Sequence, residues 1–150
     1  GDSSTKRYVD WSPNGNKILY SSDVTGYSQI FTIEPDGTNK QQITTDGNEY
    51  QQSNWSPDGS KIALISIPNG GNYVEIYTMN PDGTGLQRLT NSSSIDELPN
   101  WSPDGSKLIF ESDRTGNSEI FKINADGTGS PINLTANNAV DYFSDWSPVE

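Results

Sequence analysis

Serine and carboxylate side chains are the groups best suited to catalysis in this sequence, because its 150 residues contain no histidine and no cysteine. A serine nucleophile needs an adjacent base, and the Gly-x-Ser-x-Gly motif that exposes such a serine is absent. Paired carboxylates perform acid–base chemistry only when the fold holds them at a defined separation. No spacing in the sequence sets such a separation, so we predict no catalytic residues and no enzymatic activity.

Two oxygen-rich segments, residues 23–29 and 113–119, have the composition of calcium-binding loops. They lack the regular acidic spacing and the final glutamate that hold Ca²⁺ in such loops. Each segment also carries Asp and Gly where a hairpin must reverse direction, and both residue types favour turns. We therefore predict turns here, with no metal site and no cofactor.

Three acid-containing pairs are candidates for binding a partner, because each pair lies a few residues before a tryptophan. They are Glu49 with Tyr50, Asp96 with Glu97, and Asp141 with Tyr142. A fold that gathers these pairs at one channel mouth would line it with carboxylates and tyrosines. Such a mouth would attract a cationic peptide or coordinate a cation. The alternative is a structural role, in which the acids accept hydrogen bonds from backbone amides.

The tryptophans that follow these pairs mark an internal repeat. The segment Trp-Ser-Pro-Asp-Gly-Ser-Lys at 101–107 recurs at 55–61 and, with two substitutions, at 11–17, and its first three residues recur at 146–148. The four tryptophans, Trp11, Trp55, Trp101 and Trp146, are separated by 44, 46 and 45 residues. This period is typical of the four-stranded blades of a β-propeller. A tryptophan at the same position of each repeat indicates a structural role in packing between blades.

Each repeat has the pattern of four antiparallel strands joined by glycine-containing turns. In the third repeat we predict strands at 98–103, 107–112, 119–123 and 131–135. The second strands are apolar on consecutive residues, which indicates that both faces are buried, whereas the half-polar fourth strands are typical of an outer edge. The predicted fold is all-β and forms one unit over residues 1–150. It consists of three four-stranded antiparallel blades at about 6–45, 50–91 and 96–135, followed by an extra first strand at 141–148.

The charge of the chain limits its partners. The net charge is -11, from 20 acidic and 9 basic residues. Nucleic-acid binding requires a basic surface, and anionic membranes repel such a chain, so we expect neither as a partner. No apolar run of about 18 residues occurs, so we also predict no membrane insertion. The lack of cysteine excludes disulfides and thiolate metal sites.

The repeat Trp-Ser-Pro-Asp-Gly-x-Lys, followed by Ser-Asp-x-x-Gly, Asp-Gly-Thr and Leu-Thr, resembles the TolB-type β-propeller repeat from about residue 6 to residue 148. This family includes propellers of periplasmic proteins and of prolyl-oligopeptidase-like and tricorn-type peptidases. The resemblance implies a periplasmic or extracellular location and a ring that usually has six blades. This chain departs from the pattern by supplying only three blades and one strand. The envelope and lipoprotein-binding roles known in the family are therefore implied only for the class.

Three blades leave two apolar sheet faces uncovered, because propellers close with four to eight blades. We predict a homodimer in which two arcs form one six-bladed ring related by a two-fold axis. The strand at 141–148 would pair with the first blade of the neighbour and displace its residues 6–13, or those residues would keep their place. The function that follows is a non-enzymatic scaffold for protein interaction or self-assembly. Two alternatives stay open: a substrate-selecting propeller of a larger peptidase, and an excised or engineered fragment without a function of its own.

Overall fold

The computed structural model describes residues 4–68, 71–142 and 144–147, and all the regular structure in these ranges is β-strand. The strands are β1 (Lys6–Trp11), β2 (Ile18–Ser22), β3 (Gln29–Ile33), β4 (Gln41–Gln42), β5 (Glu49–Trp55), β6 (Ile62–Ile67), β7 (Glu75–Met79), β8 (Gln87–Arg88), β9 (Asp96–Trp101), β10 (Lys107–Ser112), β11 (Glu119–Asn124) and β12 (Ile132–Asn133). They form three four-stranded antiparallel sheets, each in sequence order. The described residues contain no helix with the length and apolarity needed to cross a membrane.

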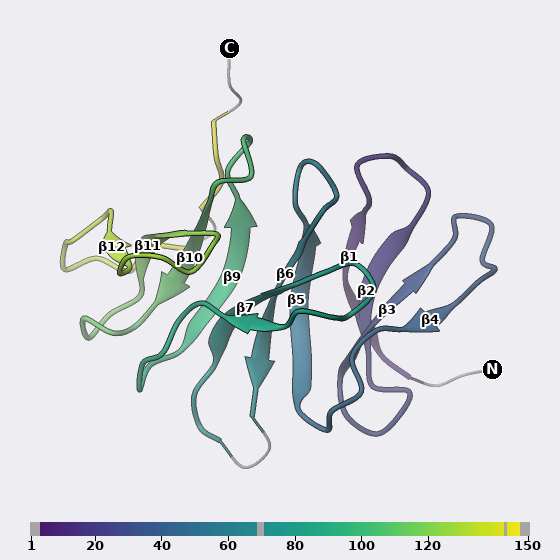
Figure 1. Cartoon of the computed structure of the whole chain (residues 1–150). Coiled ribbons are helices and arrows are strands. Elements are labelled where there is room, and N and C mark those ends of the chain that lie inside the picture. Colours follow the sequence, from purple (N-terminus) through teal and green to yellow (C-terminus); the bar gives the residue numbers. More distant parts are fainter. Residues whose placement is uncertain (1–3, 69–70, 143, 148–150) are drawn as a thin grey trace.

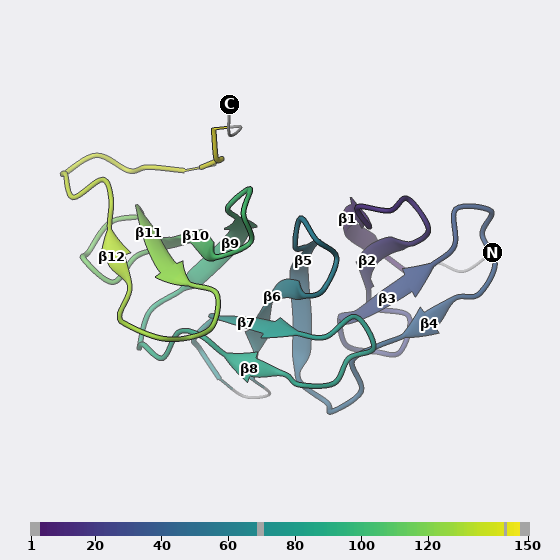
Figure 2. The same cartoon turned by 45° about the horizontal axis from the view of Figure 1, so that its top comes forward.

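The three sheets stand side by side as the blades of an arc (Figure 1). The first strands β1, β5 and β9 are neighbours along the inside of this arc, and the fourth strands β4, β8 and β12 lie on its outside (Figure 2). We call the sheets blade 1, blade 2 and blade 3 in chain order. The predicted all-β architecture of three four-stranded blades is therefore confirmed.

The hydrophobic core lies between the blades, in two separate clusters. One cluster joins blades 1 and 2, and its buried members are Leu19, Ile30, Tyr50, Trp55, Ile62, Leu64 and Met79. The other joins blades 2 and 3 through Ala63, Ile65, Ile76, Trp101, Leu108, Phe110, Phe121 and Ile123. Consecutive residues of β6 belong to different clusters, because successive side chains of a strand point to opposite faces. The prediction that the second strands are buried on both faces is confirmed for blade 2.

The fourth strands are shorter than predicted, with two residues each. A threonine ends the pairing in every blade, because its hydroxyl replaces a backbone partner. Thr44 Oγ1 accepts the amide hydrogen of Ile30 at 2.9 Å, and Thr90 Oγ1 accepts that of Ile76 at 2.9 Å. The same hydroxyls donate to the residue that begins the third strand, which is Glu75 in blade 2.

The turn after each tryptophan closes through the same hydrogen bonds in all three blades. In blade 2 the amide of Gly59 donates to the carbonyl of Ser56 at 2.9 Å, and Gly59 has a φ of 71°, which glycine adopts without strain. Asp58 Oδ1 accepts hydrogen bonds from the Ser56 hydroxyl at 2.6 Å and from the Ser60 amide at 2.9 Å. These donors lower the pKa of Asp58 to about 2, and the equivalent contacts lower the pKa of Asp104 to about 2.

The extra strand predicted at 141–148 is not formed by the residues that the structure describes there. Residues 141, 142 and 144–147 run without strand pairing, and residues 143 and 148 lie outside the described residues. A strand requires a neighbour to complete its hydrogen-bond ladder. The described chain offers this segment no fourth blade with which to pair.

The lowered pKa values predict how acid weakens the fold. A carboxyl whose folded pKa lies below its unfolded value of about 3.9 stabilises the fold above that pH, and this contribution is lost as pH falls toward 2. We expect the double variant D58N/D104N to be less stable at pH 7 and to lose stability less steeply between pH 4 and pH 2. Urea denaturation over this pH range measures both effects. Asn14 of blade 1 already accepts the equivalent bonds, so the variant should fold. An unchanged acid slope would contradict the assignment.

Candidate functional site

A β-bulge interrupts the first strand of every blade at the same place, three residues before the tryptophan. The residues at the bulge are Tyr8, Gln52 and Leu98, with φ values of 54°, 50° and 54°. The left-handed region is unfavourable for residues with a Cβ atom, and such strain is frequent at functional sites. Because the first strands lie next to one another, the three bulges follow one line along the inner surface of the arc.

A groove of about 450 Å³ follows this line. Its lining comes from the three bulges and from the segment that follows blade 3: Tyr8, Val9, Asp10, Gln52, Ser53, Asn54, Leu98, Pro99, Asn100, Ser144 and Asp145. The walls combine apolar side chains with amide and carboxylate groups. No lysine or arginine occurs among the described residues that line it, so its charge favours a cationic ligand.

Two buried polar atoms of β5 lie in this lining without a hydrogen-bond partner among the described residues. They are the hydroxyl of Ser53, a residue that is 4% exposed, and Oδ1 of Asn54. The amide nitrogen of Asn54 is already used, because it donates to the carbonyl of Pro99. An unpaired buried polar group is costly, so these atoms are well placed to bind water or a polar ligand.

Side-chain hydrogen bonds between neighbouring first strands fix the width of the groove. Asp10 Oδ2 accepts the backbone amide hydrogen of Trp55 at 2.8 Å, which ties β1 to β5. Gln52 Oε1 accepts the amide hydrogen of Leu98 at 2.6 Å, which ties β5 to β9. The second of these bonds joins two of the bulge residues themselves.

Four of the six sequence-predicted channel-mouth residues lie within the first strands β5 and β9, whereas Asp141 and Tyr142 lie in the segment after blade 3, which forms no strand. Tyr50 is paired with Ser66 and Asp96 with Ser112, so these two residues hold equivalent positions in blades 2 and 3. Both are buried, with exposed fractions of 1% and 0%. The Tyr50 hydroxyl donates to Asp46 Oδ2 at 2.6 Å, and burial raises its pKa to about 12, with a further contribution from Asp46.

The other four predicted residues reach the surface but do not form one ring. Glu49 lies one residue before Tyr50, so it has no counterpart among the other predicted residues of the repeats. It borders a separate polar cavity of about 290 Å³. Glu97 is half-buried, and its Oε2 accepts a hydrogen bond from Gln52 Nε2 at 3.2 Å. Asp141 Oδ2 accepts a hydrogen bond from Asn137 Nδ2 at 2.8 Å, and Tyr142 is exposed. The partner-binding role of these residues stays a prediction.

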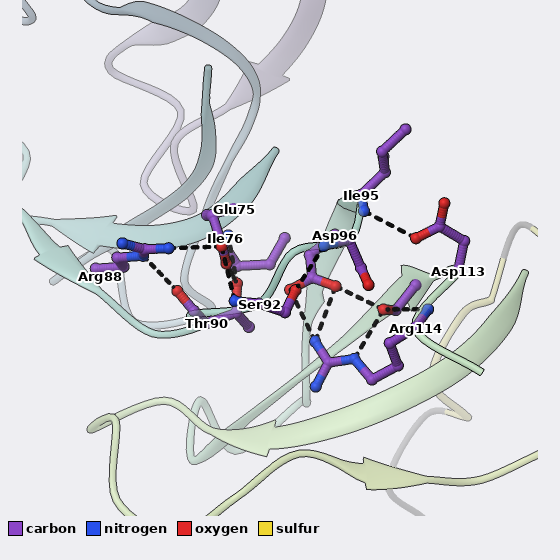
Figure 3. A network of polar contacts seen from close by, with 11 residues as sticks. Glu75, Ile76, Arg88, Thr90, Ser92, Ile95, Asp96, Asp113 and Arg114 are labelled. Carbon is purple, nitrogen blue, oxygen red and sulfur yellow. Dashed lines mark hydrogen bonds and ion pairs between the residues drawn. The ribbon is translucent and has the colours of Figure 1, made fainter. Parts of the chain in front are cut away.

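Asp96 belongs to a buried polar network between blades 2 and 3 (Figure 3). Arg114 Nη2 donates to both carboxylate oxygens of Asp96, at 2.8 and 2.7 Å, and the Ser112 hydroxyl donates to Asp96 Oδ1 at 2.6 Å. Ser92 continues the network, because its amide donates to Glu75 Oε1 at 2.8 Å and its hydroxyl lies 3.3 Å from Asp96 Oδ2. Asp96 is thus fully committed to internal bonds.

Sequence reasoning missed the groove and the bulges that form it. The only signal in the sequence is position: the lining residues are those one to three places before each tryptophan. Their types differ between blades, with Tyr8, Gln52 and Leu98 at the bulge, so no motif marks them. The described residues also contain no group of three or more acidic side chains placed to hold a metal ion.

Comparison with known proteins identifies relatives of this arrangement. The TolB beta propeller domain model matches residues 55–150. TolB from Acinetobacter baumannii is similar in structure, with a TM-score of 0.77 and 31% identity over 91% of this chain and 33% of its own. A putative TolB from Agrobacterium tumefaciens has a TM-score of 0.76 and 23% identity, over 86% of this chain and 48% of its own. The chain therefore spans less than half the length of these relatives.

Enzymes share the same fold at lower identity. A puromycin-hydrolyzing peptidase from Mycobacterium tuberculosis has a TM-score of 0.71 and 14% identity, and the match covers 90% of this chain and 21% of the peptidase. Identity at this level shows the fold alone. No protein with a curated description matches the sequence.

The buried network predicts a large effect of Arg114 on stability. We expect R114A to lower the free energy of unfolding by about 3 kcal/mol, because it leaves the Asp96 carboxylate buried without its counter-ion. The double variant D96N/R114L should recover much of this loss, since it removes both charges. Urea denaturation of the two variants measures the difference. Equal losses in both would show that the pair is not the stabilising unit.

Proposed function

Because the chain belongs to the TolB β-propeller family, we propose that it is a non-enzymatic protein-binding scaffold of the periplasm or the cell exterior. We further propose that its three blades close with a second copy into a six-bladed ring. The observation that carries this proposal is the exposure of one tryptophan. Trp11 is 54% exposed, whereas Trp55 and Trp101, which hold the same position in blades 2 and 3, are 8% and 7% exposed.

The difference arises because the preceding blade covers Trp55 and Trp101, and no described blade precedes blade 1. Blade 3, at the opposite end of the arc, likewise has one face that no described blade covers. Ile43 and Leu89 pack partly buried against the next blade, but the equivalent Leu134 on blade 3 is exposed. Apolar faces of this kind are typical of interfaces. The uncovered face of blade 1 corresponds to the face of blade 2 that packs on blade 1, and the uncovered face of blade 3 corresponds to the face of blade 2 that packs on blade 3. A second copy could therefore cover both faces with the same kind of contact that joins the blades.

The groove along the first strands is the proposed site for a protein partner. Its volume and mixed lining suit a polypeptide segment, and its strained bulges place the unpaired groups of Ser53 and Asn54 in the wall. Asp10 and Asp145 line the groove. Glu97 is next to it, because Glu97 accepts a hydrogen bond from Gln52, which also lines the groove. This charge supports a segment that carries lysine or arginine. Closure of the ring would extend the groove into a central channel.

A role as the propeller of a larger peptidase is the second proposal, and the solved peptidases with the same fold support it. It requires a hydrolase domain in addition to these 150 residues. The scaffold proposal rests on the groove and on the two uncovered blade faces, which lie within them. Hydrolysis of peptides by the isolated 150-residue chain would contradict both proposals.

The ring predicts the mass of the protein in solution. We expect light scattering after size exclusion to give about twice the 16.4 kDa of one chain, because one copy leaves both end faces uncovered. The mass should stay constant over a hundredfold range of concentration above the dissociation constant. A folded monomer throughout this range would contradict ring closure.

The carboxylates at the groove predict salt-dependent binding of basic peptides. We expect a lysine-rich peptide to bind, and the double variant E97Q/D145N to weaken its affinity by about twofold to tenfold, since exposed ion pairs contribute less than about 1 kcal/mol each. Titration calorimetry at low and high salt measures this change. The control is D82N/D126N, which removes two charges from outer turns of blades 2 and 3. Equal weakening by both variants would indicate attraction by net charge alone.

A further inference from the structure

The segment after blade 3 follows the path that a first strand takes in the other blades, although it forms no strand. We call its described residues, 141, 142 and 144–147, the tail. The amide of Asp141 donates to the carbonyl of Ser118 at 2.9 Å. The corresponding bonds at the start of β5 and β9 join Tyr50 to Ser28 and Asp96 to Val74, both at 2.8 Å. The tail is therefore docked on blade 3 as β5 is docked on blade 1 and β9 on blade 2.

The tryptophan of the tail confirms this register. Trp146 Nε1 donates to the carbonyl of Asn100 at 3.2 Å, as Trp101 Nε1 donates to the carbonyl of Asn54 at 3.3 Å. Asn100 Nδ2 also donates to Asp145 Oδ1 at 2.9 Å. The tail thus makes side-chain bonds to blade 3 of the kind that join neighbouring blades. It lacks only a second strand with which to pair.

One residue of the tail, the aspartate before its tryptophan, matches β1 rather than β5 or β9. Asp10, Trp11 and Ser12 recur as Asp145, Trp146 and Ser147, whereas blades 2 and 3 have asparagine before the tryptophan. This aspartate has a specific role in blade 1, because Asp10 Oδ2 accepts the Trp55 amide hydrogen. A tail seated beside β2 of another copy would place Asp145 where it can accept that same bond.

A six-bladed ring brings the tail and β1 into competition. The place that the tail occupies on blade 3 is the place that β1 of the second copy would take. Since both cannot occupy it, we propose that the tail of each copy pairs with β2 of the partner copy and displaces the partner's own β1. This strand exchange rests on the proposed ring, and it would join the two copies by backbone hydrogen bonds as well as by packing.

The residue types at the start of the two competing segments favour the tail over β1 as the strand that pairs with β2 in the closed ring. Lys6 of β1 holds the position at which Tyr50 and Asp96 are buried in the other blades, so ring closure over β1 would bury an ammonium group. Transfer of a charged ammonium group from solvent to a buried position is costly. The tail instead supplies Asp141, which is of the same type as Asp96 and already accepts a hydrogen bond from Asn137. In the exchanged pairing, Asp141 would lie opposite Ser22 and Tyr142 opposite Ser21.

Paired cysteines test the exchange directly, because the chain has no cysteine of its own. In β1, Arg7 is the strand partner of Ser21, and Tyr142 is its counterpart in the tail. Directly opposed strand residues are close enough for a disulfide. We expect oxidised S21C/Y142C to migrate as a covalent dimer in non-reducing electrophoresis. The matched control R7C/S21C, which bridges β1 to β2 within one chain, should form little intrachain disulfide in the dimer.

The outcomes separate the exchange from the ring. A dimer by light scattering in which S21C/Y142C stays unlinked, while R7C/S21C closes within each chain, would overturn the exchange and leave the ring intact. A monomer for the unmodified protein would overturn both. Covalent trimers and larger species from S21C/Y142C would support the exchange but replace the closed ring by an open head-to-tail assembly.

Discussion

Packing of one sheet face against the next is the interaction on which this structure depends. No blade has a core of its own, because the buried apolar residues lie in two clusters between blades. Only blade 2 has both faces covered by described neighbours. In repeat proteins of this kind the stability of each unit is largely the stability of its interfaces. Trp11 and Leu134 are exposed for this reason, although their sequence positions are those of buried residues elsewhere in the chain.

The same dependence shapes the inner surface. Antiparallel pairing leaves the first strand of each blade as a sheet edge, and unprotected edges are prone to unwanted pairing. The bulges at Tyr8, Gln52 and Leu98 interrupt these edges. The hydrogen bonds that Asp10 and Gln52 accept from the backbone amides of Trp55 and Leu98 then tie each edge to its neighbour. A continuous ladder is thereby replaced by a groove with unpaired polar atoms, and a surface of this kind suits ligand binding better than further strand addition.

Electrostatics divides the carboxylates of this acidic chain into two groups. Asp58 and Asp104 sit in exposed turns, where hydroxyl and amide donors hold their pKa values low and organise the backbone. Asp96 is buried and depends on Arg114, which also lies over the rings of Phe110 and Phe121 at 5.5 and 4.7 Å. Asp58 and Asp104 each stabilise only their own turn. Asp96 instead connects the loop after blade 2 to Arg114 of blade 3. A high count of acidic residues therefore does not by itself indicate an acidic binding surface.

The sequence alone determined the repeat, the four-strand pattern of each blade and the turn after each tryptophan, because these depend on local propensities and on a period that recurs three times. It also placed Trp55 and Trp101 between blades. Tertiary structure decided what the local pattern does not encode. It buried Tyr50 and Asp96, two of the residues that were predicted to line a channel mouth. It also bulged the first strands and shortened the fourth strands. The physical reason is that burial and strand register at these positions are set by the neighbouring blade, whose contacts are remote in sequence.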